Sequence, residues 1–175
     1  MNWRKDEAEA ERVLACLAAI DYGFDHFTLE GFARWLERRR GRPIVFVPRH
    51  MPATVFGAWV FAADTDYVFY EIDTPPLHQA HIRLHEMAHM LLGHPTVRVD
   101  AQETQALLRG TGPDLTSVDS LLLRSTHTDE VEQEAELLAT LIQDRALRHT
   151  RSRALAATTA QDRNLAGFIE LLEIG

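Results

Sequence analysis

The spacing of apolar residues predicts two helices at the start of the chain. Over residues 4–20 the apolar side chains fall on one helical face, and acidic residues in the first turn complement the helix dipole. That face consists of Ala8, Val13, Leu14, Leu17 and Ile20. A second apolar stripe predicts a helix over residues 28–40, in which Thr28 is the N-cap and Gly41 ends the helix.

Three short runs rich in β-branched and aromatic residues follow, and they predict strands. The runs cover residues 43–47, 55–62 and 67–72. Residues 64–66, Asp-Thr-Asp, separate the last two runs and are typical of a hairpin turn. We therefore expect a small three-stranded antiparallel sheet.

The second half of the chain predicts further helices and one long connection. A helix is expected over residues 79–92, which contain no Pro or Gly and end at Gly93. Two more are expected over residues 128–147, capped by Thr126 or Thr128, and over residues 160–174. The last of these would turn its apolar residues toward the core: Leu165, Phe168, Ile169 and Leu172. Residues 96–126 look irregular, and a connection of this length is typical of a functional flap or a mobile loop.

Together these patterns predict an α+β fold that is mostly helical, in a chain of 175 residues that suits a single domain. The composition, 46% apolar and 25% charged, is globular. A net charge of -8 argues against direct binding of nucleic acid or of an anionic membrane, since neither partner offers a positive field. No apolar run approaches the roughly 20 residues that span a bilayer. Cys16 is the only cysteine, so no internal disulfide can form, and we expect a cytoplasmic protein.

The predicted helix over residues 79–92 contains the motif His85-Glu86-Met87-Ala88-His89. On a helix, His85 and His89 stand one turn and about 6 Å apart on the same stripe, and two imidazoles so placed can bind one Zn²⁺. Glu86 projects about 100° away from His85. It can therefore face water at an open coordination position, as the general base of a metal-dependent hydrolase does. The alternative is an amphipathic helix whose histidines are merely solvated.

A catalytic zinc site takes three protein ligands, so one more is needed. On the predicted helix after residue 128, Glu132 and Glu136 share a face with two alanines, Ala135 and Ala139. Small side chains let that helix approach the first, and a buried carboxylate needs a cation beside it. Glu132 is the first choice and Glu136 the alternative. Both would be ordinary exposed glutamates if no metal binds.

Two further histidines, His81 and His94, lie near the motif. Three successive histidines of one helix cannot all converge on one ion, so we expect His81 to line the cleft or to be solvated. If His81 or His94 instead completed a set of four protein ligands, the zinc would be structural rather than catalytic.

The order of these elements resembles the ImmA/IrrE family of metallopeptidases over about residues 28–145. The shared features are two helices, a small sheet, a helix with His-Glu-x-x-His and a helix with Glu-x-Glu-Ala-x-x-x-Ala. The resemblance implies a zincin-like fold in which His85, His89 and Glu132 hold Zn²⁺ and Glu86 is the base. It divides the chain into an N-terminal helix (1–27), a catalytic core (28–148) and a C-terminal helical extension (149–175).

The same resemblance implies a regulator that cleaves or antagonises a helix-turn-helix repressor. We expect a zinc-dependent endopeptidase that cleaves such a repressor and relieves repression, and an acidic surface suits a basic DNA-binding partner. One alternative is a zinc-stabilised regulatory or toxin-antitoxin-type module that binds its partner without cutting it. Another is a plain α+β domain without metal. Glu86 favours the enzyme, because a purely structural zinc does not need a carboxylate that is not a ligand.

Overall fold

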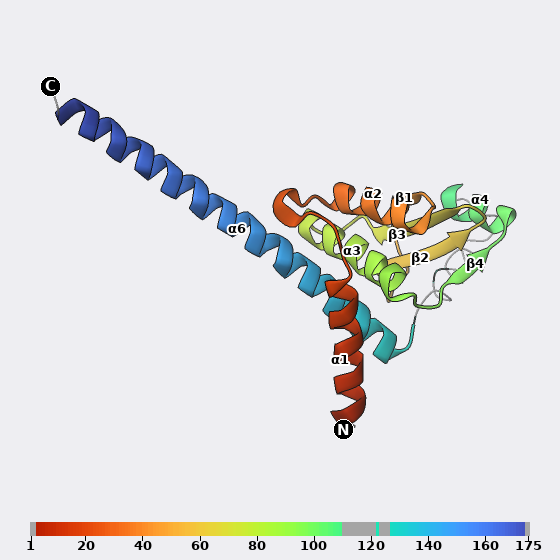
Figure 1. Ribbon diagram of the computed structural model, residues 1–175. Coiled ribbons are helices and arrows are strands. Elements are labelled where there is room, and N and C mark those ends of the chain that lie inside the picture. Colours follow the sequence, from red (N-terminus) through yellow and green to blue (C-terminus); the bar gives the residue numbers. More distant parts are fainter. Residues whose placement is uncertain (1–2, 110–121, 123–126, 174–175) are drawn as a thin grey trace.

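The computed structural model describes residues 3–109, 122 and 127–173, with side chains described over residues 7–109, 122 and 127–158. The described part has a mixed α+β fold (Figure 1). Its elements are α1 (Trp3–Ala18), the 3₁₀ helix η1 (Phe24–His26), α2 (Leu29–Arg40), β1 (Ile44–Arg49), β2 (Gly57–Ala62), β3 (Thr65–Glu71), α3 (Pro76–Leu92), β4 (Val97–Val99), α4 (Ala101–Arg109) and α6 (Asp129–Glu173).

The sheet has four strands in the order β1-β3-β2-β4. The antiparallel hairpin of β2 and β3 is confirmed, with Ala62 paired to Thr65 across the turn. The prediction of three antiparallel strands is wrong in two respects, because β1 runs parallel to β3 and a fourth strand runs parallel to β2. Apolar patterning identifies a strand but not its neighbours, and a strand of three residues such as β4 is too short to show a pattern.

Helix α3 lies in the middle of the main core, between the sheet and the other helices. Figure 1 shows α2 and α3 beside the sheet and α6 crossing below α3. Contacts join α3 to β2, β3, α1, α2 and α6. Leu84 and Met87 are buried within a cluster that includes residues of α1, α2, α6 and the sheet. The histidine motif is therefore carried by a helix that is fixed from several sides.

The predicted limits of α2 are confirmed by its caps. The Thr28 hydroxyl accepts a hydrogen bond from the Gly31 backbone N–H at 3.0 Å, as an N-cap does. At the other end Gly41 has φ 69°, in the left-handed region that favours glycine. The basic residues at this end bind within the fold, since Arg40 and Arg42 lie 2.9 and 3.4 Å from the buried carboxylate of Asp66.

The prediction that residues 96–126 are irregular is wrong over residues 97–109, which form β4 and α4. The carboxylate of Asp100 accepts hydrogen bonds from the backbone N–H groups of Gln102 and Glu103. The side chain of Glu103 accepts one in return from the Asp100 N–H. This reciprocal cap marks a helix start that the sequence contained. Residues 110–121 and 123–126, and with them the proposed cap Thr126, lie outside the described residues.

Helix α6 is one continuous helix where two were predicted. The sequence between residues 147 and 160 is polar but contains neither Gly nor Pro, so nothing in it breaks a helix. Figure 1 shows α6 passing beside α3 and extending beyond the rest of the protein. The side chains of residues 160–174, predicted to face the core, lie outside the described ones. Among the helices of the described chain, none is both long and apolar enough to cross a membrane.

Candidate metal centre

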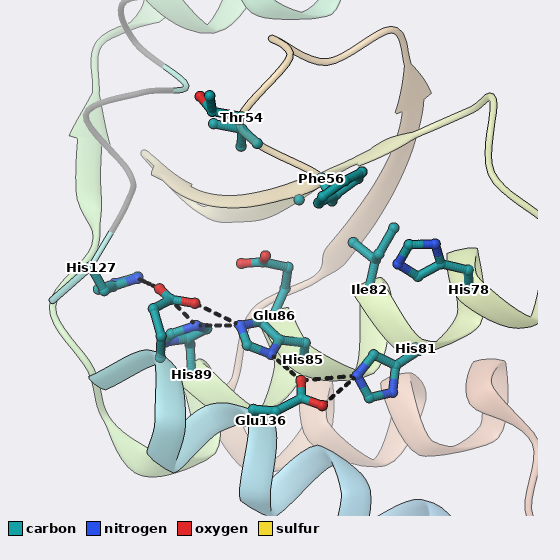
Figure 2. A pocket seen from close by; sticks show the side chains of 13 residues that line it. Thr54, Phe56, His78, His81, Ile82, His85, Glu86, His89, His127 and Glu136 are labelled. Carbon is teal, nitrogen blue, oxygen red and sulfur yellow. Dashed lines mark hydrogen bonds and ion pairs between the residues drawn. The ribbon is translucent and has the colours of Figure 1, made fainter. Parts of the chain in front are cut away.

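Helix α3 places the two motif histidines side by side. The helix begins with Pro76 at its first position and ends at Gly93, whose N–H donates to the carbonyl of His89. His85 and His89 lie one turn apart, and their Nε2 atoms are 3.0 Å from each other. Both rings thus present the same nitrogen to one point in space (Figure 2).

Helix α6 brings a carboxylate to that point. The Oε2 of Glu132 lies 3.0 Å from His85 Nε2, and its Oε1 lies 3.6 Å from His89 Nε2. Helices α3 and α6 can approach closely because the side chains of α6 that are buried there, Ala135 and Ala139, are small. The structure therefore brings together the three side chains named from the sequence as ligands.

The three donor groups fit a zinc ion. Their ligand atoms all lie within 4.8 Å of one another. The three separations of 3.0, 3.0 and 3.6 Å bracket the roughly 3.3 Å edge of a tetrahedron whose metal-ligand bonds are about 2.0–2.1 Å. Two imidazoles and one carboxylate form a donor set that catalytic zinc takes in hydrolases, with a fourth position left open.

The other candidates from the sequence lie elsewhere. Glu136 contacts Nδ1 of His85 at 3.2 Å, on the opposite edge of the ring from Glu132. His81 contacts Glu136 and Gln143, and His94 contacts Nδ1 of His89. Neither His81 nor His94 thus joins the three ligands, and the geometry favours Glu132 over Glu136.

Glu86 lies beside this cluster without belonging to it. Its side chain is buried, with 6% exposed, and extends toward the chain segment before β2 (Figure 2). Burial raises the pKa of Glu86 to about 7, although the nearby His85 and the backbone N–H of Trp59, which donates to the carboxylate, both lower it. A Cβ at Gly57 would stand 2.5 Å from Cγ2 of Ile82 and 2.6 Å from Oε1 of Glu86, so a larger residue at this position would displace these side chains.

His127 also reaches the cluster, and sequence reasoning missed it. Its Nδ1 lies 3.1 Å from Glu132 Oε1, and its ring stacks on His89 with the centroids 4.2 Å apart. Its Nε2 donates to the carbonyl of Pro95. His127 precedes α6, and its position in the sequence has no helical spacing relative to His85 and His89. The only sign of its role in the sequence was that a histidine stands five residues before Glu132.

The electrostatics keep His89 and Glu132 in the forms that bind a metal, whereas in the absence of a metal they favour the protonated form of His85. Burial lowers the pKa of His89 to about 4, which keeps its imidazole neutral. The imidazoles of His127, then His85 and His89, lie against Glu132 and hold its pKa far below its usual range, so it stays ionised. Burial alone would lower the pKa of His85, but the hydrogen bond to Glu132 and the neighbouring carboxylates outweigh it and raise that pKa.

A cavity of about 400 Å³ opens over the cluster, a volume within the range of ligand pockets. One wall is the segment of residues 54–57, and the others come from α3 and α6. At its edge the ring of Phe56 lies 5.6 Å from that of His78 (Figure 2). The candidate ligands and Glu86 therefore face a space that a substrate can enter.

Comparisons of this chain with protein-family models, with curated proteins and with solved structures found no match. The resemblance to the ImmA/IrrE family thus depends on the motifs and their order alone.

Proposed function

We propose that this protein is a zinc-dependent endopeptidase of the ImmA/IrrE type. The observation that carries the proposal is the buried carboxylate of Glu86, which lies next to three converging ligands and faces the same cavity. A zinc ion held by His85, His89 and Glu132 would supply a Lewis acid that polarises a peptide carbonyl and acidifies water.

The chain's own residues have distinct parts in this chemistry. His85, His89 and Glu132 would hold the ion beside the cavity. Glu86 accepts the proton of the attacking water and passes it to the leaving amine, which is general base and then general acid catalysis. Gly57 keeps the space that Glu86 occupies, and the Trp59 N–H orients its carboxylate.

The proposed substrate is a helix-turn-helix repressor, and cleavage would relieve repression in the cytoplasm. This part follows from the family resemblance and from charge, since a chain of net charge -8 attracts a basic DNA-binding protein. A cavity of about 400 Å³, lined on one side by residues 54–57, supports a peptide substrate because its volume can take a short piece of chain.

The test is co-expression with a candidate helix-turn-helix repressor, followed by detection of repressor fragments. We expect fragments with the wild type, none with Glu86→Gln and none after zinc is removed by a chelator. Glu130→Gln removes the same charge from an exposed position of α6 and should cut normally. Cleavage by Glu86→Gln would refute the assigned role.

One observation favours a second candidate, a zinc-stabilised regulatory or toxin-antitoxin-type module. His127 lies against both Glu132 and His89, and a fourth protein ligand would make the zinc structural. The same co-expression separates the two functions. A module that binds without cutting would relieve repression equally well with Glu86→Gln.

A further inference from the structure

A chain of buried polar side chains lies behind His89, on the side away from the cavity. The Nδ1 of His89 is 2.9 Å from the Nδ1 of His94. The Nε2 of His94 is 2.8 Å from Oε2 of Glu134, and the same oxygen is 2.9 Å from the guanidinium of Arg12. His89, His94 and Glu134 are 1%, 5% and 7% exposed, so water has little access to the contacts among these three side chains.

These contacts determine which nitrogens carry protons. A carboxylate only accepts hydrogen bonds, so Nε2 of His94 must be the donor to Glu134. In a neutral His94 the Nδ1 is then the acceptor, and the proton between the two rings belongs to Nδ1 of His89. The Nε2 of His89 is left with a free lone pair, directed toward His85 and Glu132.

We infer that Glu134 is a positioning residue, which acts through His94 to fix the tautomer and ring orientation of His89 for metal binding. This inference rests on the proposed metal centre. Such partners behind a ligating histidine orient the ring and raise its basicity as a ligand. In this protein the imidazole of His94 lies between His89 and the carboxylate of Glu134. The last member of this series of contacts, Arg12, belongs to the N-terminal helix α1.

The other motif histidine, His85, also has a carboxylate behind its ring, but without an imidazole in between. The Nδ1 of His85 contacts Oε2 of Glu136 directly at 3.2 Å. Helix α6 therefore supplies one ligand, Glu132, and the carboxylates that orient both histidines, Glu134 and Glu136. Arg12 also donates to the carbonyl of Leu92 at the end of α3, so α1 contacts both helices of the centre.

The inference is tested by zinc dissociation constants, measured in competition with a chromophoric chelator. We expect His94→Leu and Glu134→Leu each to bind zinc 10–100-fold more weakly than the wild type. Glu134→Gln keeps a carbonyl oxygen that accepts from His94 and should recover most of the affinity. Glu130→Gln, on the same helix, should bind as the wild type does.

The double variant, His94→Leu with Glu134→Leu, shows whether the two residues act in series. If they do, it binds zinc no more weakly than His94→Leu alone, because Glu134 has no route to His89 without the imidazole. Independent losses that multiply, or unchanged affinity in Glu134→Leu, would overturn the inference. A wild type that binds no zinc would instead refute the proposed metal centre itself.

A second pair of variants covers the case in which the leucine variants do not fold. Asparagine at position 94 presents its carbonyl oxygen near the place of Nδ1, where it can accept from His89, whereas glutamine reaches toward the place of Nε2. We expect His94→Asn to bind zinc at least tenfold more tightly than His94→Gln. Equal affinities would contradict the proposed proton arrangement.

Discussion

Replacing the proposed base, Glu86→Gln, should stabilise the metal-free protein while it abolishes cleavage. Glu86 is buried, and burial raises its pKa from 4.5 to about 7. The folded state therefore disfavours the charged carboxylate, whereas the unfolded state ionises it freely. Glutamine has nearly the same shape and no charge, so it removes this penalty and leaves the packing in place.

The sign and size of the effect follow from the two pKa values of Glu86. Between pH 4.5 and 7 the folded protein binds one proton more than the unfolded chain, so the stability of the wild type falls as pH rises through this window. A shift of about 2.5 units corresponds to about 3 kcal/mol at pH 8, and to less than about 1 kcal/mol at pH 5. The gain from Glu86→Gln should therefore grow by about 2 to 3 kcal/mol between pH 5 and pH 8.

Urea unfolding of both proteins in a chelator, at pH 5, 6, 7 and 8, measures this difference. Glu130→Gln is the matched control and should show no gain that grows with pH. Added zinc should reduce the advantage of Glu86→Gln, because a nearby cation stabilises the carboxylate. A difference in stability that does not change with pH, or a less stable Glu86→Gln at pH 8, would refute the reasoning.

Three further substitutions test the surroundings of the site. Gly57→Ala places a Cβ 2.6 Å from Glu86 Oε1, so cleavage should fall about 100-fold with zinc affinity retained. The control Gly23→Ala, whose Cβ meets nothing within 4 Å, should change neither cleavage nor zinc affinity. Ala139→Leu overfills the contact of α6 with α3 and should cost about 1–3 kcal/mol in urea unfolding, with weaker zinc binding; unaltered binding would show that helix spacing does not place the third ligand. Asp66→Asn leaves two arginines without their buried anion and should cost about 3–5 kcal/mol, and a loss below 1 kcal/mol would contradict this.

The parts of the fold that depend on neighbouring residues could be read from the sequence. Thr28 and Gly41 set the ends of α2 by local hydrogen bonds and backbone conformation. The β2–β3 hairpin follows from a short turn between two apolar runs. The parallel pairing of β1 with β3 could not be read, because it depends on which edge remains free once the hairpin has formed. The continuity of α6 was not predicted, although residues 147–160 contain neither Gly nor Pro.

The residues of the candidate site likewise differ in whether local sequence spacing places them. His85, Glu86 and His89 lie on one helix, so spacing alone places them relative to one another. Glu132 could be proposed only because buried alanines mark the face on which two helices meet. His94 and His127 enter through turns beside these helices, and no periodicity indicates where a turn directs its side chain.

The central claim is that His85, His89 and Glu132 bind one zinc ion. The most direct measurement is the zinc content per chain of protein purified without a histidine tag, then stripped with a chelator and titrated with zinc. We predict one tightly bound zinc in the wild type and in Glu130→Gln, and loss of tight binding in Glu132→Ala. A wild type that takes up no zinc, or a Glu132→Ala variant that binds it as tightly as the wild type, would contradict the claim.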